Sequence, residues 1–359
     1  MQEREKIRQL FERYQQGRCT PEEQARLHTW FNRYASREAS GVDELLEMYE
    51  ANRTYKQKQW LRWLPHAAVL AMALTTTWYF WGDSDSSQPT DNLVVQSGDI
   101  VPGGNRATLA LADGRTIDLS EAQSGIVVGD EQILYAEGAE ALVNLEGDEA
   151  IPLVMSTPRG GTYQITLSDG TKVWLNAAST LKYPSKFSRN KRLVEIDGEA
   201  YFSVVKDAKR PFRVVSKGQE IEVLGTAFNI SAYQDEAEIK TTLIEGSVRL
   251  QIGTSGERVS LVPGEQSILS GTTITKRAVD TAPYIAWKDG NFHFDNISLS
   301  DMLKQMSRWY DVDVVYENVV PKERFSGAMS RSVTLQTVLE LLRISEINYR
   351  IVGNKLIIE

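Results

Sequence analysis

The sequence predicts a multi-domain fold class: a small α-helical N-terminal domain, one transmembrane helix, an all-β domain of sandwich or jelly-roll type, and a C-terminal α+β domain. Apolar residues recur at helical spacing over residues 1–60, and an uncharged run follows at 63–81. Beyond that run, strand-like alternation with turn pairs replaces the helical spacing. The predicted limits are 1–60 for the helical domain, 61–81 for the transmembrane helix, 82–100 for a linker, 101–275 for the β-rich domain and 285–359 for the C-terminal domain.

The N-terminal segment, residues 1–60, contains the pattern of three short amphipathic helices. Gly17 ends the first helix, and Thr20-Pro21 supplies an N-cap and a first-turn proline for the second. A bundle this small buries little apolar surface by itself, so its aromatic-rich faces are predicted to bind a partner protein. The alternative is that the same side chains form only the bundle core. The predicted partner-binding residues are Leu10, Phe11, Tyr14, Leu27, Trp30 and Phe31.

The run from Trp63 to Trp81 contains no charged side chain. Its length is close to what a helix needs to cross the hydrocarbon core of a bilayer, and indole rings at both ends favour the headgroup region. Basic residues precede the run and acidic residues follow it, so the N-terminus is predicted to be cytoplasmic. A buried core helix is the alternative. The predicted transmembrane residues are Trp63, Ala67, Leu70, Leu74, Trp78 and Trp81.

Short alternating strands and turn pairs fill residues 101–275 and predict a sandwich or barrel. The turn pairs are Asp113-Gly114, Asp169-Gly170, Asp197-Gly198, Glu245-Gly246 and Pro263-Gly264. A pattern of P-x-G, two apolar positions, D-G and two further apolar positions occurs twice, once from Pro102 and again from Pro158. We interpret it as one hairpin used twice.

Residues 291–359 change pattern again and predict the order β-α-β-β-α-β-β. The first helix is expected from Ser298 to Tyr310, with Ser300 as its cap, and the second from Thr334 to Leu342. A closing hairpin is expected around Gly353-Asn354.

Few residues suggest chemistry. The three histidines are scattered and Cys19 is the single cysteine, so neither a metal site nor a cofactor is predicted. Without a long basic patch, direct nucleic-acid binding has little support, and Asp197 and Glu199 are interpreted as solvated acids beside a turn. The chain is not expected to be an enzyme. The exception is Gly225-Thr226, where a strained backbone would let the threonine hydroxyl attack the preceding carbonyl and cleave the chain; the alternative is a glycine bulge in a strand.

Several segments together resemble the FecR family of membrane-bound anti-sigma factors, in the form common in Bacteroidetes. The resemblance rests on ordered motifs: Ser156-Thr157-Pro158-Arg159-Gly160-Gly161-Thr162-Tyr163, Leu167 through Ala177, Gly198-Glu199-Ala200-Tyr201-Phe202, Pro211-Phe212, Val223 through Asn229, Glu245-Gly246-Ser247-Val248 and Leu261 through Gln266. Residues 291–359 look like the domain that follows in such proteins, which is similar to short signalling domains of secretins and TonB-dependent receptors.

The resemblance implies an inner-membrane anti-sigma factor. Its N-terminal helices would bind an extracytoplasmic-function sigma factor, and its periplasmic domains would receive a signal from the N-terminal signalling domain of an outer-membrane TonB-dependent receptor. Some family members are cleaved at a Gly-Thr that matches Gly225-Thr226. The rival interpretation is a membrane-anchored envelope protein that binds carbohydrate or peptidoglycan through Trp174, Tyr183, Tyr201 and Trp287.

Overall fold

The computed structural model describes residues 99–129, 131–138, 141–145, 149–253, 256–345 and 347–359, all within one compact unit, Val95–Glu359. The predicted helical domain at 1–60 and the predicted span at 61–81 lie outside the described residues. The fold class is corrected, because the described chain is mostly β and its longest helix, α6 (Leu299–Tyr310), has 12 residues. In that part of the chain no helix is long and apolar enough to cross a membrane.

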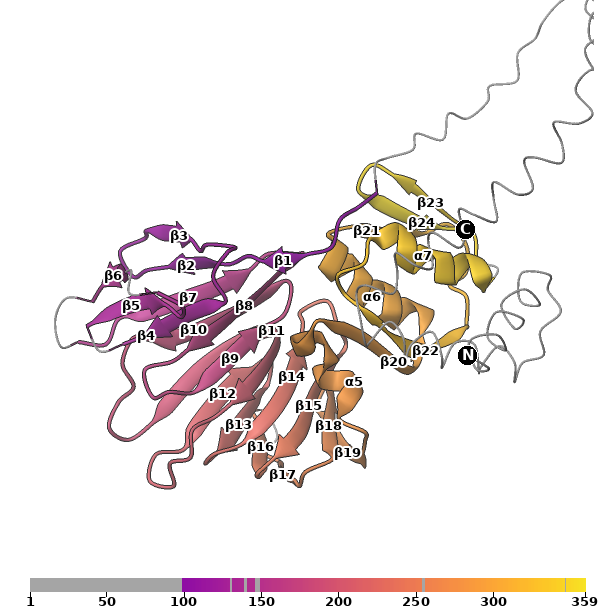
Figure 1. The fold of residues 1–359 in the computed structure, drawn as a ribbon. Helices are drawn as coiled ribbons and strands as arrows, with labels where there is room; N and C mark the ends of the chain where they lie inside the picture. The colour runs from indigo at the N-terminus through magenta and orange to yellow at the C-terminus, as the bar shows by residue number, and fades with distance from the viewer. Residues whose placement is uncertain (1–98, 130, 139–140, 146–148, 254–255, 346) are drawn as a thin grey trace, which may run out of the picture. The chain divides into compact units, whose positions relative to one another are not determined.

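Two β-sheets face one another to form the sandwich, residues 104–278 (Figure 1). Hydrogen-bonded neighbours in the first sheet run in the order β3-β2-β7-β10-β11-β12-β13-β16-β17. Its strands are β2 (Thr108–Ala110), β3 (Thr116–Asp118), β7 (Pro152–Thr157), β10 (Ser179–Pro184), β11 (Arg192–Ser203), β12 (Phe212–Ser216), β13 (Gln219–Val223), β16 (Val248–Ile252) and β17 (Arg258–Leu261).

The second sheet has the order β6-β5-β4-β8-β9-β11-β14-β15-β18-β19. Its other strands are β4 (Gly125–Val128), β5 (Gln132–Tyr135), β6 (Ala141–Asn144), β8 (Gly161–Thr166), β9 (Lys172–Leu175), β14 (Ala227–Ala232), β15 (Glu238–Glu245), β18 (Glu265–Ser270) and β19 (Thr273–Ala278). The short strand β1 (Gly104–Asn105) pairs in parallel with the start of β8.

Strand β11 belongs to both sheets. Residues up to Asp197 pair with β10 in the first sheet, and residues from Gly198 onward pair with β14 in the second. Gly198 has a φ of +98°, and a Cβ there would lie 2.4 Å from the Ser179 Oγ, so only glycine fits the bend. The prediction of a turn at Asp197-Gly198 is therefore wrong, because this pair lies inside a continuous 12-residue strand.

The repeated hairpin is confirmed. In the first copy the amides of Leu111 and Gly114 close the turn between β2 and β3 at 2.9 and 3.1 Å. The amides of Leu167 and Gly170 close the turn between β8 and β9 in the same way, both at 2.8 Å. The copies lie in opposite sheets, and β1 of the first pairs with β8 of the second.

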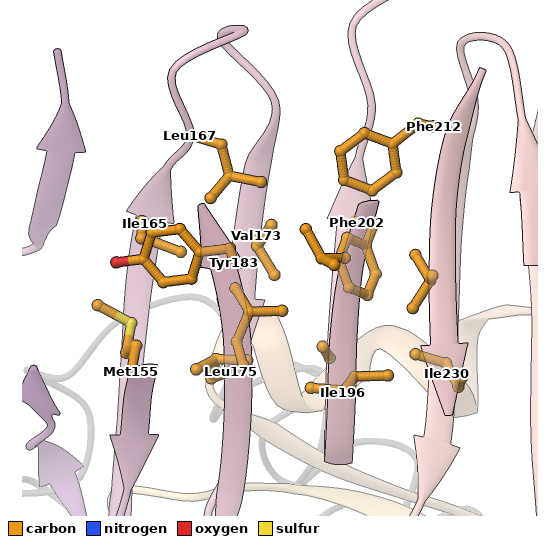
Figure 2. Packing of buried hydrophobic residues seen from close by; sticks show 14 of the residues in the cluster. Met155, Ile165, Leu167, Val173, Leu175, Tyr183, Ile196, Phe202, Phe212 and Ile230 are labelled. Atoms are coloured by element: carbon orange, nitrogen blue, oxygen red, sulfur yellow. The ribbon is translucent and has the colours of Figure 1, made fainter. Parts of the chain in front are cut away.

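Apolar side chains from both sheets fill the space between them. Alternate residues point inward along strands such as β8 and β12, where buried and partly buried residues alternate. Figure 2 shows part of this core, where Phe202 packs against Phe212 and where Leu175 and Ile196 belong to the same apolar cluster. At its margin Arg192 and Asp169 form an ion pair of 2.8 Å with side-chain exposures of 1% and 4%. Neither side chain reaches water. The pair links the turn of the β8-β9 hairpin, which contains Asp169, to Arg192 at the start of β11.

Residues 291–358 form a second, smaller core, called here the C-terminal module. Its elements are β20 (Asn291–Ser298), α6, β21 (Asp313–Tyr316), β22 (Arg324–Ser330), α7 (Leu335–Ile344), β23 (Tyr349–Val352) and β24 (Lys355–Ile358), in the predicted order. Strand β20 pairs with β22, and β21, β24 and β23 form a separate sheet. The connection from the sandwich contains α5 (Ala282–Ile285) and the 3₁₀ helix η2 (Ala286–Asp289).

The cap of α6 differs from the prediction. Ser298, not Ser300, is the N-cap, and its hydroxyl oxygen accepts the amide hydrogen of Asp301 at 3.1 Å. The same hydroxyl donates to the Asp301 carboxylate at 2.7 Å. A serine followed three residues later by an acid is a close variant of the capping box, and the acid also interacts favourably with the helix dipole.

Candidate functional site at the junction of sandwich and C-terminal module

A carboxylate on the sandwich anchors the junction. Glu199 on β11 accepts hydrogen bonds from the side-chain amides of Asn176, just after β9, and Asn229, on β14, at 2.7 and 2.9 Å. The three residues lie on adjacent strands, because β11 pairs with β9 on one side and with β14 on the other. Sheet pairing thus brings together three polar residues that are far apart in the sequence.

The side-chain oxygens of Asn176 and Asn229 accept hydrogen bonds from residues that follow the sandwich in the sequence. Asn176 Oδ1 accepts from both terminal nitrogens of Arg331 at 3.1 Å, and Asn229 Oδ1 accepts from the indole nitrogen of Trp287 at 3.2 Å. Each asparagine therefore donates to Glu199 and accepts from a group beyond the sandwich. Because carboxylate, indole and guanidinium each accept only or donate only, neither amide can be reversed without placing donors against donors.

Arg331 is buried without a carboxylate partner within hydrogen-bond distance among the described residues; its exposure is 4%. Its guanidinium stacks 3.8 Å from the centroid of Trp309, and Trp309 donates its indole hydrogen to the Arg331 carbonyl at 2.8 Å. Burial lowers the pKa of the Arg331 guanidinium to about 10. The cost of burying this cation is offset by the aromatic face and by the Asn176 oxygen.

Arg308 on α6 makes a second connection. Its guanidinium hydrogen bonds to Glu236 at 2.7 Å and to Asp235 at 2.8 Å, and lies 3.7 Å above the ring of Tyr233. The side chains of Arg308 and Glu236 are 10% and 18% exposed, whereas that of Asp235 is 68% exposed. The bond to Glu236 is therefore expected to contribute most of the ionic stabilisation.

Arg159, in the turn between β7 and β8, makes the third connection. It bridges Asp313 at 2.7 Å and Asp311 at 3.1 Å, and it also donates to the carbonyls of Ser307 and Val312. The Ser307 carbonyl lies in the last turn of α6, where a cation interacts favourably with the helix dipole, and Val312 follows the helix. Three arginines, one from the sandwich and two from the C-terminal module, thus hold the junction.

The electrostatics of Glu199 follow from this geometry. Removal from solvent raises the pKa of its carboxyl, while the hydrogen bonds from Asn229 and Asn176 act in the opposite direction. A cavity of about 560 Å³ adjoins the carboxyl, with Ser231 and Lys240 on the sandwich side and Gln305 on α6. The described residues hold no group of three or more His, Cys, Asp or Glu side chains placed to bind a metal ion.

Sequence reasoning missed the role of Glu199. The sequence pattern predicts that Asp197 and Glu199 are solvated acids beside a turn, but they lie in the parts of β11 that belong to different sheets. Asp197 accepts only an exposed hydrogen bond from Gln234 at 3.0 Å. One signal was available: Asn176, Glu199 and Asn229 each lie in a motif that carries the family resemblance.

The Gly225-Thr226 pair lies between β13 and β14. Gly225 has a φ of +155°, and a Cβ there would lie 2.6 Å from the Cα of Lys206. Gly246 packs on the same peptide, since its Cβ would lie 2.8 Å from both the Gly225 oxygen and the Thr226 Oγ1. The buried Thr226 hydroxyl donates to the carbonyl of Ser247 at 3.0 Å. The Gly225-Thr226 peptide is therefore closely packed on both sides, and the Thr226 hydroxyl hydrogen points to a backbone oxygen.

The four aromatic residues of the carbohydrate-binding interpretation do not form an open platform. Tyr183 is buried in the sandwich, with 3% exposure. Trp174 and Tyr201 pack edge to face with ring centroids 5.5 Å apart, and the Lys288 ammonium lies 5.5 and 5.4 Å from their centres. Trp287 uses its indole hydrogen for Asn229. Trp174 and Tyr201 therefore lie against Lys288 of η2.

The other predicted site residues lie outside the described residues, so they stay predictions. They are the partner-binding set Leu10, Phe11, Tyr14, Leu27, Trp30 and Phe31, and the membrane set Trp63, Ala67, Leu70, Leu74, Trp78 and Trp81.

The fold defines a β-sandwich with an α+β module packed against it, and comparison with known proteins gives the family. Residues 154–249 match the FecR protein family, and residues 291–358 match the FecR C-terminal family. A solved structure from Parabacteroides distasonis, provisionally described as an anti-sigma factor, shares 31% identity with a TM-score of 0.54, over 57% of this chain and 98% of that one. A second structure from the same organism, with the same description, shares 30% identity with a TM-score of 0.54, over 58% and 98%.

The chain belongs to the FecR family, and the family matches together with these solved structures support an anti-sigma factor of that family. A different likeness is partial: a UPF0173 metal-dependent hydrolase of Opitutus terrae is 27% identical over 128 residues, which cover 35% of this chain. The chain spans 56% of the length of that curated relative.

Proposed function

We propose that this anti-sigma factor binds an extracytoplasmic-function sigma factor through residues 1–60 and relays a signal from the N-terminal signalling domain of an outer-membrane TonB-dependent receptor. The observation that carries the proposal is the junction. Arg331 of the FecR C-terminal match bonds to Asn176 of the FecR match, and Asn176 bonds to Glu199 on β11. A partner that moves the C-terminal module relative to the sandwich must disturb this network.

The sigma-factor part of the proposal is tested by co-purification of the full chain with the candidate sigma factor. Alanine at Phe11 or Trp30 is expected to lower sigma recovery by at least about tenfold, because buried aromatic residues dominate interface energies. Gln15→Ala, in the same segment, is the matched control and should leave recovery unchanged. Failure of the unmodified chain to recover any sigma factor would refute this part.

The receptor part is tested separately. The purified N-terminal signalling domain of the candidate receptor is added to the full chain, and binding is measured by calorimetry. Arg308→Met, which loosens the junction without removing the C-terminal module, is expected to change the affinity. Equal affinity for wild type and variant would show that the receptor domain does not act through the junction.

We also propose that the chain is held at the inner membrane with its N-terminus in the cytoplasm and its sandwich in the periplasm. Support comes from the uncharged run at 63–81, preceded by Arg53, Lys56, Lys58 and Arg62 and followed by Asp83. Protease added to spheroplasts should degrade the sandwich and spare an N-terminal tag. Protection of both parts would contradict this orientation.

Self-cleavage at Gly225-Thr226 is a second proposal, supported by the close packing around this peptide. The Thr226 oxygen would attack the Gly225 carbonyl carbon, the C–N bond would break to give an ester and a free amine, and water would hydrolyse the ester. Intact mass should then reveal fragments 1–225 and 226–359. Thr226→Ser should retain cleavage and Thr226→Ala should abolish it; a single intact mass for the wild-type chain would exclude it.

A further inference from the structure

The first described residues of the chain bind the C-terminal module before they enter the sandwich. The leading segment, defined here as Asp99–Gly103, precedes β1 and lies against the elements of this module (Figure 1). The Ile100 carbonyl accepts the amide hydrogen of Leu335 at 3.0 Å, and the Asp99 carboxylate accepts that of Gln336 at 3.2 Å. Ile100 also packs against the apolar core of this module. Two segments near opposite ends of the described chain are therefore in direct contact.

The two amides have no partner within their own helix. Leu335 and Gln336 are the first residues of α7, and the first four N–H groups of an α-helix lack an intrahelical acceptor. The leading segment supplies acceptors for two of them, and the negative charge of Asp99 suits the positive end of the helix dipole. The contact thus behaves as an N-cap provided by a distant part of the chain.

Gly103 fixes the other end of the segment. A Cβ at this position would lie 2.8 Å from two ring carbons of Trp309 and 2.5 Å from the carbonyl oxygen of Gly160. The Trp309 ring also contacts the Arg331 guanidinium, which donates a hydrogen bond to Asn176 Oδ1. One indole ring therefore packs on the leading segment and on the arginine network of the junction.

After Gly103 the chain enters the sandwich as strand β1. The Gly104 amide donates to the Gly160 carbonyl at 2.9 Å, and the Gly160 amide donates to the carbonyl of Arg308 on α6 at 2.7 Å. From Ile100 to Gly104 there are four Cα steps, which extend to about 14 Å at most. A displacement of the C-terminal module beyond that reach must detach the leading segment from α7.

We propose that the C-terminal module holds the leading segment directly, and that release of this contact is the step by which a change in the module reaches residues 1–98. The sandwich then serves as the fixed support against which the module moves. The effect on signalling rests on the proposed function. The contact between the leading segment and α7 does not depend on that function.

Two adjacent glycines provide a matched test. Gly103→Ala places a methyl group against Trp309 and Gly160, whereas a Cβ at Gly104 has no atom within 4 Å. Hydrogen exchange of the full chain, followed by mass spectrometry, reports on the amides of Leu335 and Gln336. Exchange there is expected to rise by about tenfold in Gly103→Ala and to stay at the wild-type rate in Gly104→Ala. Equal exchange in all three proteins would overturn the proposal.

The functional consequence is measured as sigma-dependent transcription in cells without inducing signal. Gly103→Ala should change transcription severalfold and Gly104→Ala should not; an unchanged level in both, in a strain where deletion of the gene does alter transcription, would overturn the proposal. If deletion alters nothing, the signalling function itself fails, and the exchange result alone decides on the contact. Asp99→Ala, at an exposed position, is the second variant if Gly103→Ala does not fold, and faster exchange at Gln336 is then expected.

Discussion

Replacing Glu199 by glutamine tests whether the junction depends on a carboxylate. Glutamate presents two acceptor oxygens to the amides of Asn176 and Asn229, whereas glutamine presents one acceptor and one donor. One asparagine must then face a donor. If that asparagine turns over, the conflict moves outward to Arg331 or Trp287. The substitution therefore cannot be accommodated locally, and its effect must reach the C-terminal side.

The expected magnitude follows from one unsatisfied donor. A buried donor without a partner costs about 1–3 kcal/mol. A loss of about 2 kcal/mol lowers the Tm by roughly 4–8 °C in a unit of this size. Thermal unfolding of the full chain measures it, with Asp197→Asn as the control on the same strand. The control loses only an exposed hydrogen bond and should stay within about 0.5 kcal/mol. Equal losses in the two variants would refute the reasoning.

The pH dependence of stability is expected to differ between wild type and Glu199→Gln, and the sign of the difference follows from the pKa of Glu199. Burial raises the pKa of the Glu199 carboxyl, so the folded state favours its protonated form relative to the unfolded state. The corresponding stabilisation is present below the ordinary value of 4.5 and is lost as pH rises through the folded pKa. Wild type should therefore lose stability across this window relative to Glu199→Gln, which lacks the ionisation. A parallel pH profile for both proteins would contradict the prediction.

Three further substitutions test other contacts. Asp169→Asn leaves the buried Arg192 cation without its carboxylate and should cost about 3–5 kcal/mol in urea unfolding; a loss below about 1 kcal/mol would argue against a buried ion pair. Gly246→Ala, at a φ of +91° and against the Gly225 oxygen, should lower stability by about 1–3 kcal/mol by calorimetry, and an unchanged Tm would mean that the backbone relaxes. Arg308→Met should give faster amide exchange along α6 with unchanged exchange in β8, and uniform exchange would contradict a local role.

Much of the fold could be predicted where pairing is local. The hairpins at Asp113-Gly114 and Asp169-Gly170 join strands that are adjacent in both sequence and sheet, so turn chemistry alone identifies them. Glu245-Gly246 and Pro263-Gly264 have the same appearance but connect strands of opposite sheets. Local patterns do not say which sheet the next strand joins. Asp197-Gly198 also has the appearance of a turn pair, but it lies inside β11, where Gly198 bends the strand from one sheet into the other.

The candidate site could not be predicted because it depends on registers between distant strands. Asn176, Glu199 and Asn229 become neighbours only when β9, β11 and β14 pair in the observed alignment. Burial of Arg331 was likewise invisible, since arginine in a polar loop normally reaches water. The resemblance did point to these segments, but it named them as motifs and not as a connected network.

The bend of β11 has a consequence for how the chain folds. Neither sheet can be completed until this strand is in place, because Val194 pairs within the first sheet and Phe202 within the second. Its partners lie both upstream, in β9 and β10, and downstream, in β12 and β14. Contacts of such long sequence separation slow folding. The sandwich is therefore expected to form in one late cooperative step, after residues beyond 232 have become available.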